Sequence, residues 1–267
     1  MKLLHAFLTR DFYTEASYRF SFLITVAGIF FNAFVFYFLA QLIGDAAAPL
    51  LADYRGDYFA FVLIGVAFGG YFGVGLTSFA GALRQAQTTG TLEAMLMTPT
   101  PASWIIVGSA AWSYLFTTFR VLVYLLIGTL LLGVNLGGAN YLGALVALAL
   151  AIVSFASIGI LAASVIMVIK RGDPLTGLLS QLANLIGGVF YPVEILPAWL
   201  QWAAKLLPIT YALRAMRLAL LAEASWRDLA PDLLALALFC AVLFPLSLLA
   251  FRFAVNRARV DGSLAHY

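Results

Sequence analysis

Long apolar runs alternate with short polar connections along most of the chain, and this alternation predicts a helical membrane protein. Five runs reach the roughly 20 residues that a helix needs to cross the hydrocarbon core of a bilayer. They cover residues 20–43, 58–79, 104–134, 141–169 and 233–253. A sixth run, residues 175–191, is at the short end of that range. The pattern therefore predicts an all-α polytopic membrane protein with six transmembrane helices, in a single transmembrane domain over residues 1–267.

Residues 1–19 precede the first run and have a different pattern. Apolar residues recur there at helical spacing, whereas most polar and charged residues fall on the other side of the helix. The apolar positions are Leu3, Leu4, Phe7, Leu8 and Phe12. We expect an amphipathic helix that lies at the membrane interface. Such a helix serves either as a simple membrane anchor or as a contact for a partner subunit.

Positive charges are distributed unequally between the two sides of the predicted bundle. Cytoplasmic segments of membrane proteins are enriched in Lys and Arg. The two terminal segments and the connections between spans two and three and between spans four and five carry Lys2, Arg10, Arg19, Arg84, Lys170, Arg171, Arg252, Arg257 and Arg259. The opposite short connections have Arg55 against three aspartates, or no charge at all. Since six spans put both termini on one side, we expect both in the cytoplasm and the protein in the cell (cytoplasmic or inner) membrane.

A short semi-polar segment, residues 90–99, separates the second run from the third. Gly90 ends the preceding helical pattern, Thr91 can cap a new helix, and Glu93 places a carboxylate in its first turn, where the helix dipole favours it. An apolar stripe on this helix consists of Leu92, Met95 and Leu96. Pro99 ends the helix. Because a helix of about two turns is marginal in water, we expect it to dock either on this protein or on another one.

The stretch that follows the sixth run, residues 196–221, is divided by Pro197 and Pro208 into short helical pieces. A piece of roughly ten residues cannot span a bilayer, so we expect re-entrant or interfacial helices on the outer face. Arg214 and Arg217 are one turn apart on the second piece. They could anchor it at the interface, or they could meet lipid head groups or anionic cargo, and Glu194 could pair with either.

Arg120 is a charged residue well inside the third apolar run. A charge at that depth costs about 2.5–3.5 kcal/mol on insertion scales, and such residues usually mark a transport pathway or a buried partner. Arg120 could instead snorkel to the interface if the third helix begins below the membrane. The sequence leaves both interpretations open, so Arg120 is a possible cargo or lipid contact.

Composition supports a membrane protein and argues against several other classes. Hydrophobic residues make up 64% of the chain and charged residues 10%, compared with about 25% charged in soluble domains. A net charge of +3 is too small to indicate nucleic-acid binding. Cys240 is the sole cysteine, which excludes an intrachain disulfide. The sequence has no metal-binding cluster and no nucleophile–base pair, so we expect no metal site.

ATP hydrolysis by this chain is also not expected. A P-loop requires the pattern G-x-x-x-x-G-K-[ST], in which the lysine reaches the phosphates. The lysines are Lys2, Lys170 and Lys205, and none of them follows a glycine in that frame. We therefore expect no cofactor in this chain and no enzymatic activity of its own.

Two sequence segments resemble the permeases of type-two ABC exporters, which move polysaccharides, lipids, drugs and other amphiphiles. The run GTLEAMLMTPTP, residues 90–101, resembles the cytoplasmic coupling segment of that family. The run GGVFYPVEILPAWLQWAAKLLPITYALRAMR, residues 187–217, resembles the end of its fifth span and the two re-entrant helices that follow. The amphipathic start and the six spans occur in the expected order, so the resemblance covers the whole chain.

The resemblance implies specific roles and partners. The coupling helix would insert into a cleft of a separate ATPase subunit, which would bind ATP and Mg. Its residues would be Gly90, Thr91, Leu92, Glu93, Met95, Leu96, Thr98 and Pro99. An outer gate would be formed by Phe190, Tyr191, Pro192, Leu196, Pro197 and Trp199. A second copy of the chain, or a related permease, and two ATPase chains would complete the exporter in the lipid bilayer.

Two other functions compete with ATP-driven export. A self-sufficient channel or secondary carrier would need intramembrane carboxylates or matched broken helices to bind coupling ions. The carboxylates of this chain fall outside the centres of the predicted spans. An intramembrane enzyme would need facing catalytic groups within the spans, and none are found. Both alternatives are thus less consistent with the sequence than the exporter.

Overall fold

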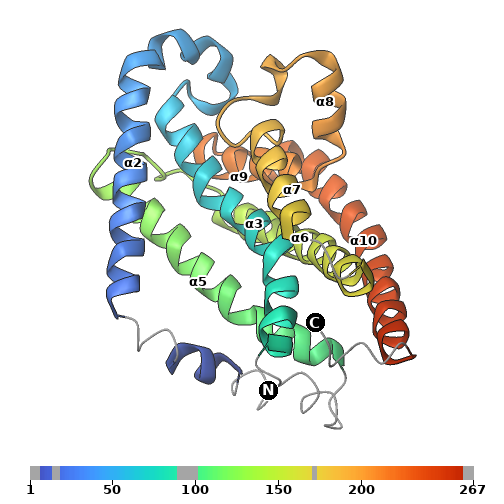
Figure 1. Cartoon of the computed structure of the whole chain (residues 1–267). Coiled ribbons are helices and arrows are strands. Elements are labelled where there is room, and N and C mark those ends of the chain that lie inside the picture. Colours follow the sequence, from blue (N-terminus) through green and yellow to red (C-terminus); the bar gives the residue numbers. More distant parts are fainter. Residues whose placement is uncertain (1–6, 14–18, 89–101, 170–172, 261–267) are drawn as a thin grey trace.

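The computed structural model describes residues 7–13, 19–88, 102–169 and 173–260, and these residues are organised as helices and connecting turns (Figure 1). Residues 7–13 form a short helix. The longer helices are α2 (Arg19–Ala47), α3 (Tyr58–Thr88), α5 (Ala102–Leu130), α6 (Tyr141–Ile169), α7 (Asp173–Ile186), α8 (Ala198–Lys205), α9 (Pro208–Leu221) and α10 (Trp226–Val260). Two 3₁₀ helices, η1 (Ala48–Tyr54) and η2 (Val193–Ile195), lie in the connections. The described part of the chain contains no strand.

Five of these helices are long and apolar enough to cross a membrane. Their apolar parts are Phe22–Gly44, Tyr58–Ala82, Ala110–Leu130, Tyr141–Met167 and Trp226–Arg257. The all-helical fold and five long apolar helices are therefore confirmed. The third helix ends four residues before the predicted boundary at residue 134, because residues 131–140 form the turns that lead into α6.

The sixth predicted span, residues 175–191, is only partly helical. Helix α7 has 14 residues, or about 21 Å of helix, whereas the hydrocarbon core is roughly 30 Å thick. The helix ends because Gly188 adopts a φ of +84°, a left-handed conformation that glycine reaches without a steric cost. Residues 187–191 thus lie in a turn, although they are apolar enough to extend the run in the sequence. A sixth crossing made by α7 together with this turn remains a prediction.

Helix α3 lies at the centre of the bundle. It contacts α2, α5, α6, α7 and α9, and most of its apolar part is buried. Its closest crossing is with α6, where a Cβ added to Gly159 would lie 1.7 Å from the carbonyl oxygen of Gly75. Small residues allow two membrane helices to approach in this way. The rings of Phe72 and Phe155 pack edge to face beside the crossing.

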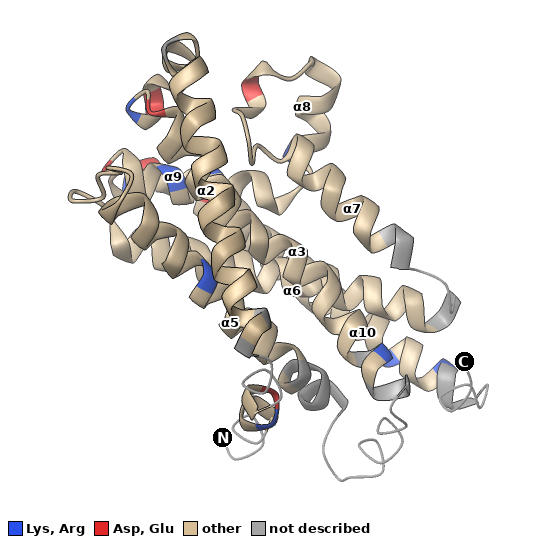
Figure 2. Cartoon of the chain, turned by 60° about the vertical axis from the view of Figure 1, so that its left-hand side comes forward, with Lys and Arg blue, Asp and Glu red and all other residues tan. Residues whose placement is uncertain are grey.

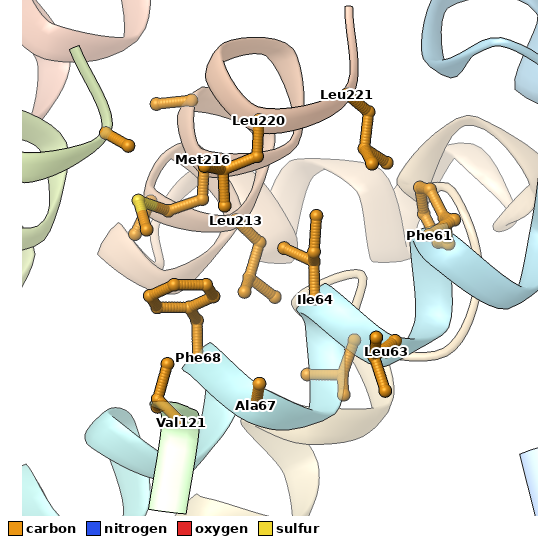
Figure 3. Close-up of a cluster of buried hydrophobic side chains, with 14 of the residues drawn as sticks. Phe61, Leu63, Ile64, Ala67, Phe68, Val121, Leu213, Met216, Leu220 and Leu221 are labelled. Carbon is orange, nitrogen blue, oxygen red and sulfur yellow. The ribbon is translucent and has the colours of Figure 1, made fainter. Parts of the chain in front are cut away.

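Helix α9 packs into the core and not onto the surface (Figure 3). Its buried apolar residues include Leu213, Met216 and Leu220, which face Ile64 and Phe68 of α3 in the close-up. Helix α9 thereby bridges the connection after α7 and the centre of the bundle. The predicted re-entrant or interfacial helices of residues 196–221 correspond in sequence to α8 and α9.

Charged residues lie mainly at the two ends of the molecule (Figure 2). Helix 7–13 and the C-terminal part of α10 lie toward one end, and η1, η2 and α8 lie toward the other, which we call the cap end (Figure 1). The helix of residues 7–13 packs on α5, where the ring of Phe12 contacts Trp112 with centroids 5.9 Å apart. By contrast, only 11% of the most apolar stretch of α2 is buried inside the protein, and the same share holds for α10. These two helices present their apolar faces to lipid or to another protein.

Candidate functional site

The predicted coupling residues lie outside the described residues. This holds for Gly90, Thr91, Leu92, Glu93, Met95, Leu96, Thr98 and Pro99. The structure describes the helices on both sides of this segment: α3 up to Thr88 and α5 from Ala102. These two helices border the candidate coupling segment. A second candidate site, whose residues the structure describes, lies at the cap end.

The predicted gate residues lie on the connection between α7 and α8 at the cap end. The structure places Phe190, Tyr191 and Pro192 in the turn after α7, and Leu196, Pro197 and Trp199 between η2 and the first turn of α8. Phe190 stacks on Phe36 of α2 with ring centroids 5.8 Å apart. Pro192 is buried, whereas 71% of Trp199 is exposed. The six residues thus form one continuous connection, attached to α2 at its start and exposed at its end.

Arg217 of α9 holds this connection against α3. Its guanidinium donates hydrogen bonds to the carbonyl oxygens of Gly188 (2.7 Å), Val189 (2.9 Å) and Phe61 (3.1 Å). The guanidinium carbon also lies 3.4 Å from the centroid of the Phe61 ring, a cation–π contact. Burial lowers the pKa of Arg217 to about 9, which leaves it protonated at neutral pH. Arg217 therefore joins three segments that are distant in sequence.

We call the contacts of Arg217 with Gly188, Val189 and Phe61 the Arg217 clamp. Gly65 of α3 makes room for it. A Cβ at Gly65 would lie 2.0 Å from the carbonyl oxygen of Val189 and 2.4 Å from Nη2 of Arg217. Any larger side chain would separate the turn from α3 or displace the guanidinium. The close approach of α3, the turn and α9 therefore depends on a glycine at this position.

A small cavity with several charged residues in its lining lies beside the Arg217 hydrogen bonds. Its volume is about 130 Å³, and its lining includes Tyr54, Glu194, Arg214, Arg217 and Asp232. Arg214 Nε donates a hydrogen bond to Asp232 Oδ2 at 2.9 Å, and Asp232 is fully buried while 45% of the Arg214 side chain is exposed. Burial raises the pKa of Tyr54 to about 12, so its hydroxyl is neutral. The cavity thus combines the neutral Tyr54 hydroxyl with the Arg214–Asp232 ion pair, the buried Arg217, and the charged residues Glu194 and Lys205.

The residues from η2 through α8 to the start of α9, which we call the cap, are joined by local hydrogen bonds next to this cavity. The side-chain amide of Gln201 donates to the carbonyl oxygens of Glu194 and Leu196. The hydroxyl of Thr210 donates to Ala204, and that of Tyr211 to Lys205. These contacts hold η2, α8 and the start of α9 together as one unit.

Arg120 lies on α5, away from the cap. It is the one Arg or Lys residue within the α5 range Ala102–Leu130. Among the described residues, its Nε is buried and has no hydrogen-bond partner. Tyr124, one turn further along α5, lies within interaction range of the Arg120 guanidinium and donates a hydrogen bond of 3.3 Å to Asn32 Oδ1 of α2. The three candidate arginines therefore occupy two places: Arg214 and Arg217 share the cap cavity, and Arg120 stands alone.

Three residues of the cap site are not apparent from the sequence. The buried partner of Arg214 is Asp232, not Glu194, because α10 begins at Trp226 and not at residue 233 as the hydropathy pattern predicts. Tyr54 and Gly65 are a single tyrosine and a single glycine in apolar surroundings, without a local pattern. The sequence contains one signal for Asp232. It stands directly before an apolar run, and a carboxylate buried there needs a partner because an unpaired buried charge is costly.

Comparison with known proteins places the chain in a family. Residues 3–221 match the ABC-2 type transporter family. This range includes the predicted coupling segment, the Arg120 helix and the whole connection from α7 through α9. No curated protein matches the sequence. Since the match covers well over half of the 267 residues, the chain belongs to the ABC-2 type transporter family, whose members are the membrane permease subunits of ABC transporters.

Proposed function

We propose that this chain is the membrane-spanning subunit of an ATP-driven exporter and forms the translocation pathway for a lipid, glycan, drug or other amphiphile. The observation that carries the proposal is the family match over residues 3–221. ABC-2 permeases work with a separate ATPase subunit, to which this chain would couple through residues 90–99. ATP and Mg would be bound by that subunit.

The described helices support a mechanical link between the coupling segment and the cap. Helix α3 has 31 residues and is therefore about 46 Å long. Its first turns contact the Arg217 clamp through the Phe61 carbonyl, and its last residue, Thr88, directly precedes the coupling region. A push on residues 90–99 would thus reach the cap through one central helix. Shifting a closed pathway almost completely to an open one requires about 5.5 kcal/mol of differential binding.

The proposed assembly contains two permease chains and two ATPase chains. Helices α2 and α10 carry exposed apolar faces, which can contact lipid or a second copy of the chain. A related permease could take the place of that second copy. The basic residues near the end that carries helix 7–13 favour a cytoplasmic position for this end in the cell membrane. The cap, with the candidate gate, would then lie on the outer side.

The decisive experiment reconstitutes the chain with its ATPase in proteoliposomes and measures ATP hydrolysis and transport. Leu92→Asp and Glu93→Arg alter the apolar stripe and the first-turn carboxylate of residues 90–99. We expect both variants to insert normally but to lose ATPase stimulation and transport, because the helix-in-groove contact is weakened. Met97→Leu, a volume-conserving change in the same segment, serves as the control and should retain both activities.

Two outcomes would overturn the proposal. Transport and ATPase stimulation that survive both Leu92→Asp and Glu93→Arg would exclude coupling through this segment. Transport by the purified chain without any ATPase would instead support a channel or a secondary carrier.

A further inference from the structure

Arg120 lies at the centre of the apolar part of α5. This part extends from Ala110 to Leu130, so Arg120 is ten residues from either end. At 1.5 Å per residue this is about 15 Å along the helix, half the thickness of a hydrocarbon core of about 30 Å. The snorkelling interpretation is therefore unfavourable, because the side chain would have to reach across half of the bilayer. The charge has to be stabilised where it is.

The protein supplies no counter-charge at this depth among its described residues. Their acidic residues lie at or near the two ends of the molecule (Figure 2). The buried carboxylate of Asp232 is already paired with Arg214. A second copy of the same chain would add the same residues at the same depths, so a homodimer would not neutralise Arg120 either. In a homodimer the counter-charge of Arg120 therefore comes from a ligand or a lipid.

Arg120 lies on a different side of α5 from the most exposed residues of this helix. The exposed apolar stripe of this helix consists of Leu115, Phe119, Leu122, Leu126 and Leu130. Arg120 follows Phe119 by one residue, which turns it about 100° away from that side chain. It lies instead on the side of Tyr124, which contacts Asn32 of α2. Charged residues inside membranes normally face the bundle interior in this way, where cargo and ion pathways lie.

The chemistry of this cluster fits a phosphate group. A guanidinium binds phosphate through two parallel N–H donors, and the buried Nε of Arg120 is a donor without a protein partner among the described residues. Asn32 adds a side-chain amide with two N–H groups, and the Tyr124 hydroxyl orients this amide by donating a hydrogen bond to its Oδ1. The surroundings are apolar helices, so the molecule that carries the phosphate must have an apolar part as well.

We propose that Arg120, Tyr124 and Asn32 bind the phosphate group of an amphiphilic cargo in the middle of the membrane, and that the cargo is therefore an anionic phospho-amphiphile. This inference rests on the proposed transport function and narrows its substrate class.

The test uses the purified full chain in nanodiscs of phosphatidylcholine with a trace of photoreactive lipid. One probe is a diazirine-labelled phosphatidic acid, and the other is the matching diacylglycerol without phosphate. After illumination, mass spectrometry maps the cross-links on α2 and α5. We expect phosphatidic acid to label the peptides around Asn32 and Arg120 about ten- to hundredfold more than diacylglycerol, which corresponds to the loss of a charge-assisted hydrogen bond.

Variants identify the residues responsible. Arg120→Met should reduce phosphatidic acid labelling to the diacylglycerol level, and Arg120→Lys should retain part of it. Arg227→Met makes the same substitution at an exposed position of α10 and should leave labelling unchanged. Arg120→Met should also leave the thermal midpoint in nanodiscs unchanged or higher, because it removes an unpaired charge. Asn32→Leu keeps the cation and should still lower labelling.

Several results would overturn the inference. Equal labelling by the two lipids, or labelling that survives Arg120→Met, would exclude a phosphate site at Arg120. A marked loss of thermal stability in Arg120→Met would assign the arginine a structural role. Competition by millimolar inorganic phosphate would show a site for free phosphate and not for an amphiphile. The labelling experiments need no ATPase, so they test the phosphate site alone. Binding of the ATPase to the same variants tests the proposed coupling separately.

Discussion

Arg214 of α9 and Asp232 of α10 form an ion pair of 2.9 Å in which the carboxylate is fully buried and the guanidinium half exposed. The pair joins the cap to the last long helix. The second oxygen of Asp232, Oδ1, is buried and has no hydrogen-bond partner among the described residues. The negative charge of Asp232 therefore depends on Arg214 for its stabilisation.

A double-mutant cycle tests this dependence. Removing one partner of a buried pair leaves the other charge uncompensated, so Arg214→Met should lower the free energy of unfolding by about 1–3 kcal/mol, a value reduced for the exposure of Arg214. Adding Asp232→Asn should restore most of the loss, with a coupling energy of about 1–2 kcal/mol. The free energy of unfolding is measured in detergent for the unmodified protein, the two single variants and the double variant.

The exposed pair Arg55–Glu223 provides the matched control for that cycle. Its two side chains are 47% and 49% exposed, so Arg55→Met and Glu223→Gln should couple by no more than about 1 kcal/mol. Equal coupling energies in the two cycles would contradict the special role of the buried carboxylate.

Arg217→Lys should loosen the connection between α7 and α8. A lysine has one ammonium group and cannot replace a fork that donates to three carbonyl oxygens. Buried acceptors without a donor cost about 1–3 kcal/mol each, so stability should fall and amide exchange in residues 187–191 should accelerate. Hydrogen exchange with mass spectrometry measures this. Arg227→Lys, at an exposed position, should change neither quantity.

Gly65→Ala should disturb the same junction by a steric route. The added methyl group would overlap the Val189 carbonyl oxygen and the Arg217 guanidinium. Overpacking of this kind costs about 1–3 kcal/mol, so we expect a lower thermal midpoint. Gly81→Ala lies on the same helix with open space around its Cβ and should be neutral or slightly stabilising. Similar midpoints for the two variants would disprove the close approach at Gly65.

The helices could be predicted from the sequence because membrane spans depend on a property that each segment carries by itself. Apolar runs of sufficient length identify α2, α3, α5, α6 and α10 without knowledge of their neighbours. The end of α7 could not be predicted in this way, since residues 187–191 are apolar and leave the helix through the backbone conformation of Gly188. Hydropathy measures the composition of a segment and not its dihedral angles.

The contacts of the cap could not be predicted because they join segments far apart in the sequence. Arg217 and Phe61 are separated by 156 positions, and the pairing of Arg214 with Asp232 requires that α10 begin before its apolar run. The sequence analysis named Glu194 as a possible partner of Arg214, whereas the structure pairs Arg214 with Asp232. The packing of α9 against α3 decides between such alternatives, and it depends on tertiary structure.

The orientation of the chain leads to a further prediction that the lone cysteine makes straightforward to test. Cys240 is partly buried, and Cys240→Ala gives a background without thiols. Ala52→Cys places a thiol at an exposed position in η1 at the cap end, and Asn256→Cys places one at an exposed position near the end of α10. If basic residues keep the α10 end in the cytoplasm, a membrane-impermeant maleimide added to intact cells should label Ala52→Cys and not Asn256→Cys. Labelling of Asn256→Cys should appear only after permeabilisation, and the reverse pattern would place the cap and its candidate gate in the cytoplasm.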